Sequence, residues 1–325
     1  MKLPRRRFLH LAAGAAALPA VSGIARAQAY PSRPIRWIVG FVPGGATDII
    51  ARLMGQWLSE RLGQSVVIEN RPGAGSNIAT EVVVNAPADG YTLLLVGPTH
   101  TVNATLYERL NYNFIRDIAP IASISREPLV MVLNPSVPAK TVPEFIAYAK
   151  GNPGKLNMAS SGIGTAVHVG GELFKLMTGI NMLHVPYRGA APALTDLIGG
   201  RVQVMFATLP SSIEYIKAGN LRALAVTTAK RTPVLPDTPT VGDALPGYEA
   251  SAVYGVGSPR NTPAEIIDKL NKEINAGLAD ARMQARLSEL GGTVLAGSPT
   301  YFGKLIAEET EKWGKVIKFA NIKPE

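Results

Sequence analysis

Ile35-Arg36-Trp37-Ile38-Val39-Gly40-Phe41 is an apolar run of strand length, and Pro43-Gly44-Gly45 ends it. Beyond this turn, apolar residues return at helical spacing as far as about Leu62: Ile49, Ile50, Leu53, Met54, Trp57 and Leu58. A strand followed at once by an amphipathic helix is the first half of a β-α-β unit. The pattern predicts an α/β protein in which strands alternate with helices.

The same alternation continues along the chain. Strands are expected at residues 66–69, 92–96, 156–159, 202–206 and 222–226, and helices at 78–85, about 165–177, 191–198, 211–217 and around 302–317. No internal repeat or polar linker divides these segments, so two lobes are expected to be joined by short crossings. The expected crossings lie near Arg126–Leu129 and Ser251–Val256. If the chain crosses between lobes at these two points, residues 28–127 plus 252–325 form lobe 1, and residues 128–251 form lobe 2.

The first 27 residues have the features of an export signal. A basic start with Arg5-Arg6-Arg7 precedes an apolar run from Phe8 to about Ile24, and Ala25-Arg26-Ala27 fits the pattern that signal peptidase cleaves. The apolar run is shorter than the ~20 residues of a membrane-spanning helix. Cleavage after Ala27 and a periplasmic location are therefore expected. The arginines also fit a twin-arginine signal, and an Arg-rich Sec signal is the alternative.

Composition excludes several classes of function. The chain has no Cys, which excludes disulfides, thiolate catalysis and Cys-ligated metal sites. Removing the signal removes five basic residues and no acids, so the formal net charge falls from +9 to +4. This modest surplus slightly favours an anionic ligand. Lys and Arg are not clustered with aromatic residues, so nucleic acid is not an expected partner.

Three glycine-rich junctions are candidates for holding a ligand. They are Pro43-Gly44-Gly45-Ala46-Thr47-Asp48, Arg71-Pro72-Gly73-Ala74-Gly75-Ser76-Asn77 and Ser160-Ser161-Gly162-Ile163-Gly164-Thr165. Each is expected to free backbone N–H groups at a helix N-terminus, where the helix dipole attracts anions. None completes a nucleotide-binding motif, so a phosphate cofactor is not expected. Any one such junction is most often simply a turn, whereas three in one chain favour a site.

A search for catalytic and metal-binding groups finds little. The sequence has no Gly-x-Ser-x-Gly elbow and no His-Glu-x-x-His motif. His168 and Glu172 are one helical turn apart, but two ligands are too few for a metal site. No cofactor and no metal are expected. His168 either faces the cleft as a hydrogen-bond donor or packs beside its loop, and Asp48 either contacts the ligand or braces its turn.

At these loops the chain resembles the Bug family, the periplasmic solute-binding proteins of tripartite tricarboxylate transporter type. The resemblance covers essentially the whole chain after residue 27. Its motifs are Pro43-Gly44-Gly45-Ala46-Thr47-Asp48, Glu69-Asn70-Arg71-Pro72-Gly73-Ala74-Gly75, Ala88-Asp89-Gly90-Tyr91-Thr92-Leu93, Ser160-Ser161-Gly162-Ile163-Gly164-Thr165 with His168, His184-Val185-Pro186-Tyr187-Arg188-Gly189 and Asp237-Thr238-Pro239-Thr240-Val241. Each motif is weak alone, but their order and spacing are specific.

The resemblance implies a type II periplasmic binding protein fold, the Venus flytrap, in which two α/β lobes close on a carboxylate. The ligand-binding residues that it implies in lobe 1 are Gly44, Gly45, Ala46, Asp48 and Thr99. Those in lobe 2 are Ser160, Ser161, Gly164, Thr165, His168, Arg188, Ala207 and Thr208. Arg188 alternatively braces the surface of its lobe. Many relatives carry a polar pair such as Asp-Asn where Ala207-Thr208 stands here, which tilts the expected ligand from an amino acid toward a di- or tricarboxylate or an aromatic acid.

Three functions are compared. A solute-binding protein that closes on a small carboxylate and delivers it to membrane transporter subunits accounts for export, two lobes and opposed anion-binding loops. A periplasmic sensor that docks on a membrane histidine kinase when liganded is the alternative and is compatible with transport. A secreted enzyme using Asp48 or His168 as a base is the third, and no base with an orienting partner supports it. A non-enzymatic, monomeric binding protein is expected.

Overall fold

The computed structural model describes residues 30–319 and 321–324. The predicted export signal and its cleavage after Ala27 lie outside the described residues. Among the described residues, no helix combines the length and apolar character needed to cross a membrane.

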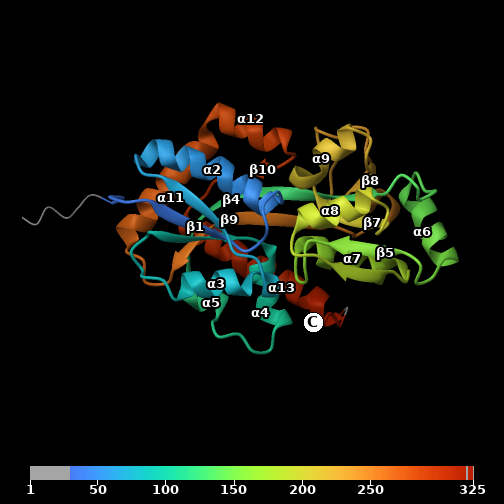
Figure 1. The fold of residues 1–325 in the computed structure, drawn as a ribbon, viewed down its shortest axis with the longest axis horizontal. Coiled ribbons are helices and arrows are strands. Elements are labelled where there is room, and N and C mark those ends of the chain that lie inside the picture. Colours follow the sequence, from blue (N-terminus) through green and yellow to red (C-terminus); the bar gives the residue numbers. More distant parts are fainter. Residues whose placement is uncertain (1–29, 320, 325) are drawn as a thin grey trace, which may run out of the picture.

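The strands form one sheet with two groups of strands (Figure 1). The first group contains β1 (Ile35–Val39), β2 (Val66–Asn70), β3 (Thr92–Val96), β9 (Ser251–Pro259) and β10 (Thr293–Val294). The second contains β5 (Asn157–Ser160), β6 (Leu183–Pro186), β7 (Val204–Thr208) and β8 (Arg222–Val226). Strand β1 pairs in parallel with β2 and β3, and β5 pairs in parallel with β6 and β7.

One long strand, β4 (Ile118–Leu133), belongs to both groups. Its residues 118–128 pair antiparallel with β9, and its residues 129–133 pair antiparallel with β7 and β8. The lobes are therefore joined through a continuous strand. Both expected crossings, near Arg126–Leu129 and Ser251–Val256, fall on β4 and β9. The residues that bound each lobe remain a prediction.

Helices cover both groups of strands, as Figure 1 shows. Around the first group lie α2 (Ala46–Leu62), α3 (Asn77–Val84), α4 (Pro98–Leu106), α5 (Phe114–Asp117), α11 (Ala264–Ala279), α12 (Ala281–Glu289) and α13 (Pro299–Phe319). Around the second lie α6 (Val142–Gly151), α7 (Ala166–Thr178), α8 (Ala190–Ile198), α9 (Leu209–Lys217) and α10 (Val241–Ala244). A single turn of 3₁₀ helix at Ala74–Ser76 precedes α3.

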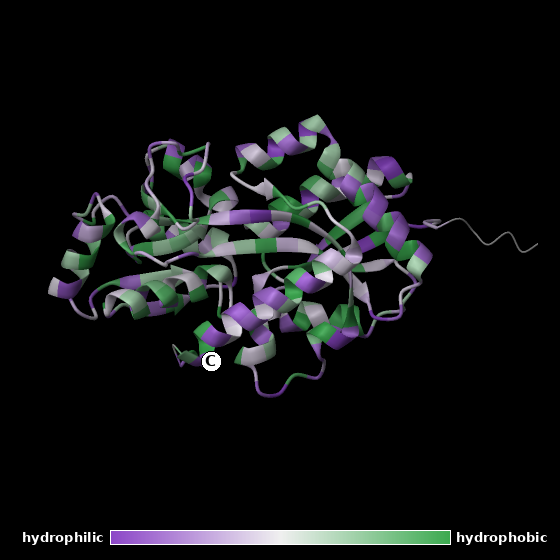
Figure 2. Cartoon of the chain, turned by 180° about the vertical axis from the view of Figure 1, so that it is seen from behind, coloured by the Kyte–Doolittle hydropathy of each residue, from purple (hydrophilic) through white to green (hydrophobic). Residues whose placement is uncertain are grey.

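The apolar core runs from one lobe into the other. Trp37 on β1, Phe145 on α6 and Trp313 on α13 are fully buried in one continuous cluster. In Figure 2 the outer helices and loops carry much of the hydrophilic colour, and the strands are green or pale over much of their length, apart from a purple stretch on one long central strand. Burial of apolar surface at about 25 cal/mol per Å² makes such a core the main source of stability. The shared core fixes the strand ends that face the cleft.

The predicted α/β class is confirmed, and the predicted strands match β1, β2, β3, β5, β7 and β8 to within two residues at each end. Four elements beside the cleft were not predicted: α4, β4, β6 and β9. Strand β4 contains Pro120 and Pro128, so its sequence lacks the uninterrupted apolar run that marks a strand.

Candidate ligand-binding site

One cavity between the lobes collects the amino-terminal ends of five helices. Its lining includes the first residues of α2, α4, α7 and α8 and the residue before α9: Ala46, Pro98, Ala166, Ala190 and Thr208. Its volume is about 40 Å³. The first N–H groups of a helix have no acceptor within the helix, and the dipole adds about half a positive charge there. Five such ends around one cavity suit an anion.

The lining itself carries no formal charge. Among the described residues, no Asp, Glu, Lys or Arg lines the cavity, and the single histidine in the lining is His100. Burial lowers the pKa of His100 to about 4, so the ring is neutral at pH 7. The Gly97 N–H donates to His100 Nδ1 at 3.0 Å, and Nε2 lies 3.3 Å from Ser76 Oγ. The positive potential of the cavity therefore comes from backbone N–H groups.

Four hydroxyl groups in the lining make no hydrogen bond with any described residue. They belong to Thr47, Thr99, Ser161 and Tyr254. The lobe 2 hydroxyls of Thr165 and Thr208 are already engaged, because Thr165 donates to Gly162 O at 2.7 Å and Thr208 Oγ1 lies 2.8 Å from Ser211 Oγ. The four unengaged hydroxyls remain available to oxygen atoms of a ligand.

Asp48 braces the Pro-Gly-Gly loop and does not line the cavity. Its carboxylate accepts hydrogen bonds from Gly44 N at 3.1 Å, Arg52 Nε at 3.0 Å and Asn70 Nδ2 at 3.0 Å. Burial alone would raise the pKa of Asp48, but these bonds outweigh it and lower the pKa. Asn70 also donates to Phe41 O at 2.9 Å. The loop is thus fixed in place before any ligand binds.

A stacked pair of histidines supports the lobe 2 loop. The rings of His168 and His184 lie 3.9 Å apart between centroids and 12° from parallel. His184 Nε2 lies 2.6 Å from Ser160 Oγ, and Gly164 N–H donates to His168 Nδ1 at 3.2 Å. Burial lowers the pKa of His168 to about 3 and of His184 to about 4, so both are neutral. Through these two contacts the histidine pair stabilises the loop on the side away from the cavity lining.

A wider groove adjoins the cavity. Its volume is about 610 Å³, and it shares Gly40, Phe41 and Ser161 with the cavity lining. Arg188 lines this groove, is exposed, and forms no ion pair with any described residue. A free guanidinium beside the cavity can meet a second anionic group.

The lobes are in contact around the cavity. Val42 N–H donates to Arg188 O at 3.5 Å across the cleft. A Cβ on Gly189 would lie 2.6 Å from Val42 Cγ2, and one on Gly164 would lie 2.9 Å from Asn103 Oδ1. Both glycines have positive φ, 153° and 74°, which side chains rarely adopt. The protein is therefore in a closed form that depends on glycine at the contact.

The structure places the predicted site residues in three groups. Six line the cavity: Gly45, Ala46, Thr99, Ser161, Thr165 and Thr208. Arg188 lines the adjoining groove. The remaining six are absent from both linings: Gly44, Asp48, Ser160, Gly164, His168 and Ala207. Direct contact of any of them with a ligand remains a prediction.

Sequence reasoning missed several lining residues, among them Phe41, Thr47, Leu95, His100 and Tyr254. Thr47 directly follows the predicted Gly44-Gly45-Ala46 run, so extending that run by one residue would have found it. Tyr254 lies on β9, which was not predicted as a strand, and no pattern in the sequence indicates that this residue lines the cavity.

Comparison with known proteins identifies the family. The model for the tripartite tricarboxylate transporter family receptor, TctC, matches residues 50–322. The chain belongs to this family. The match confirms the resemblance drawn from the loop motifs.

Relatives with known names agree with the family assignment. Protein BugT of Bordetella pertussis is 36% identical, with 92% of this chain and 94% of that protein covered. An R. palustris protein solved with adipate has a TM-score of 0.89 and 41% identity, covering 91% of this chain and all of that one. MatC from Rhodopseudomonas palustris, solved with bound malate, has a TM-score of 0.85 and 31% identity, covering 89% and 100%. The chain is a TctC-type protein with the two-lobe fold of periplasmic solute-binding proteins.

Proposed function

We propose that this TctC-family protein captures a small carboxylate in the periplasm by closing its lobes, and delivers it to the membrane subunits of a tripartite transporter. The convergence of five helix N-termini on one cavity without charged side chains carries the proposal. Such a cavity binds an anion through backbone N–H groups and hydroxyls. A cationic ligand would be repelled by the five dipoles, and a neutral ligand would gain less from them than an anion does. Export with cleavage after Ala27, which the sequence predicts, would put the protein in the periplasm.

The proposed ligand is a dicarboxylate rather than an amino acid. The cavity lining has no acidic side chain to pair with an ammonium group, and Ala207-Thr208 supplies none. One carboxylate would occupy the cavity, and the second would lie in the adjoining groove near Arg188. The structural relatives solved with adipate and malate hold ligands of this class. An aromatic acid is the nearest alternative, because Phe41 and Leu95 supply apolar surface.

Closure is the proposed mechanism. The ligand would contact Thr47 on α2, Thr99 on α4 and Tyr254 on β9. It would also contact Ser161 of lobe 2, but only when the lobes meet. A ligand shifts an equilibrium by its differential affinity for the two forms, so these contacts favour the closed form. Membrane subunits would then recognise the closed protein.

The Ser160–His184 contact does not favour an enzyme. Its 2.6 Å distance is that of a nucleophile and its base. However, Ser160 has no exposed surface, so a substrate cannot reach its hydroxyl. The contact instead orders the lobe 2 loop.

The test is a thermal-shift screen of the mature protein, refolded to remove co-purified ligand, against mono-, di- and tricarboxylates, aromatic acids and amino acids. A ligand at about a thousand times its Kd adds about 4 kcal/mol to the free energy of unfolding, so Tm should rise by several degrees. We expect the largest shift with a dicarboxylate, recovered chemically unchanged. No shift with any carboxylate would contradict the proposal, and conversion to a product would indicate an enzyme.

A further inference from the structure

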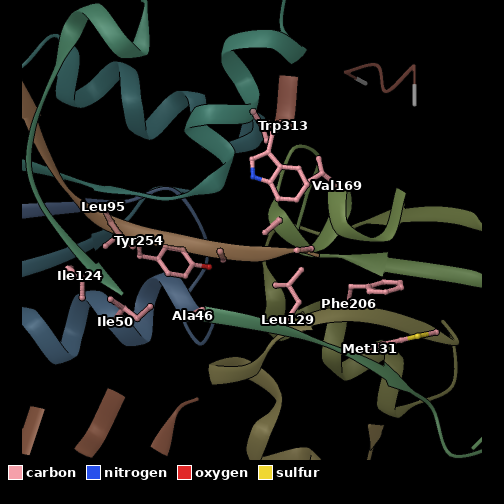
Figure 3. Close-up of a cluster of buried hydrophobic side chains, with 14 of the residues drawn as sticks. Ala46, Ile50, Leu95, Ile124, Leu129, Met131, Val169, Phe206, Tyr254 and Trp313 are labelled. Atoms are coloured by element: carbon pink, nitrogen blue, oxygen red, sulfur yellow. The ribbon is translucent and has the colours of Figure 1, made fainter. Parts of the chain in front are cut away.

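Tyr254 is a largely buried residue that lines the cavity. It lies on β9, one of the strands that connect the lobes, and is 4% exposed. Its ring packs against Gly97, where an added Cβ would lie 3.1 Å from the ring. Figure 3 shows the ring extending away from Leu95, with the hydroxyl at its far end. The residue therefore contributes both a wall and a polar group to the cavity.

This hydroxyl makes no hydrogen bond with any described residue. The hydroxyl oxygen is not among the fully enclosed polar atoms without a partner, so it is accessible from the cavity. Phe would fill the space of the ring without losing a hydrogen bond within the protein. Burial, assisted by the negative charge of Glu127, raises the pKa of Tyr254 above its usual value. The phenol therefore keeps its proton and acts as a hydrogen-bond donor. A donor that lacks a partner in the protein and is accessible from the cavity is available to an acceptor that occupies the cavity.

We propose that Tyr254 is a ligand-binding residue whose hydroxyl donates a hydrogen bond to a carboxylate oxygen of the bound solute. This inference rests on the proposed function and adds to it a contact from the strands that join the lobes. Tyr254 pairs with Ser125 on β4, whose later residues belong to the second strand group. A solute bound to Tyr254 would therefore contact β9, which pairs with the strand that joins the lobes, as well as the glycine-rich loops.

The chain offers a matched control in Tyr248. Tyr248 is 2% exposed, but its hydroxyl donates to Gly170 O at 2.9 Å. It packs against Phe174 and Phe206 in lobe 2 and does not line the cavity. Replacing each tyrosine with Phe removes one hydroxyl from a largely buried residue in either case. Only Tyr248→Phe removes a hydrogen bond within the protein.

The experiment measures Tm without ligand, and Kd by calorimetry for the carboxylate that binds wild type most tightly. For Tyr254→Phe we expect a Tm equal to or above that of wild type and a Kd about 10- to 100-fold higher, because a hydrogen bond to a charged acceptor is lost. For Tyr248→Phe we expect a lower Tm and a Kd within about threefold of wild type.

Two results would overturn the inference. One is a Kd for Tyr254→Phe that matches wild type, because the hydroxyl then makes no contact with the solute. The other is a fall in Tm as large as that of Tyr248→Phe, because the hydroxyl then has a partner in the protein itself. Absence of carboxylate binding by wild type is a separate outcome and contradicts the proposed function instead.

Discussion

Replacing Glu127 with Gln tests how a buried carboxyl on β4, the strand that joins the lobes, changes the free energy of unfolding with pH. Glu127 lies on β4 with no exposed surface, and its Oε1 accepts a hydrogen bond from Ser125 Oγ at 2.6 Å. Its Oε2 has no partner among the described residues. Burial raises the pKa of this carboxyl from 4.5 to about 7, although the bond from Ser125 opposes the rise. A buried, half-satisfied carboxylate should lower stability once it ionises.

The raised pKa gives the sign and size of the effect. Between pH 4.5 and 7 the native state binds this proton more tightly than the unfolded chain does. The stability that protonated Glu127 contributes to the free energy of unfolding is therefore fully present below pH 4.5 and is lost as the pH rises through 7. The pKa of Glu127 is 4.5 in the unfolded chain and about 7 in the native protein. At about 1.4 kcal/mol per pH unit this difference corresponds to about 3 kcal/mol. Gln has the same shape and no charge, so Glu127→Gln should escape this loss.

Urea denaturation of both proteins at pH 5, 6, 7 and 8 measures the difference. We expect the variant to gain about 2 to 3 kcal/mol relative to wild type between pH 5 and pH 8. Glu69→Gln is the control, because hydrogen bonds from Arg36 and Arg71 hold the pKa of Glu69 at about 2 and keep it ionised throughout. Its effect should be a loss that is constant over this range. A constant difference for Glu127→Gln as well would refute the reasoning.

Two further predictions concern closure and acid stability. In Gly164→Ala, the new Cβ would lie 2.9 Å from Asn103 Oδ1, at a backbone φ of 74° that alanine rarely adopts. Closure of the lobes should be impaired, so ligand affinity should fall at least tenfold. Calorimetry measures the Kd, and an unchanged value would contradict the contact between the lobes at Gly164. Burial lowers the pKa of His168 to about 3 and those of His184 and His100 to about 4, so below about pH 6.5 the unfolded chain takes up protons that the native protein does not. The free energy of unfolding of Glu127→Gln, which lacks the opposing carboxyl, should therefore fall by at least about 1 kcal/mol per pH unit from pH 6 to pH 4. Urea denaturation checks this, and a flat profile would show that these three buried rings are not shielded from protons.

Local patterns in the sequence predicted the elements that are local in the structure. The apolar run from Ile35 and the helical spacing from Ile49 gave β1, its loop and α2 to within a few residues. The glycines at 44 and 45 also gave the anion-binding end of α2. These features depend on neighbouring residues, so sequence is sufficient for them.

Features that depend on contacts distant in the sequence were not predictable. Strand β4 is interrupted by Pro120 and Pro128, and it is a strand because β9 and β7 pair with it. Tyr254 faces the cavity only because of that pairing. The histidine stack joins rings from α7 and β6, and nothing in the sequence marks His184 as the partner of His168.

The measurement that tests the account most directly compares a carboxylate with its uncharged amide. Calorimetric titration of the mature protein would use the tightest-binding carboxylate of the screen and its primary amide, which has nearly the same shape. If five helix ends hold the ligand through its negative charge, the carboxylate binds at one site per chain and the amide binds at least about a hundredfold more weakly. Equal affinity for the two compounds would contradict the claim that the cavity is an anion site.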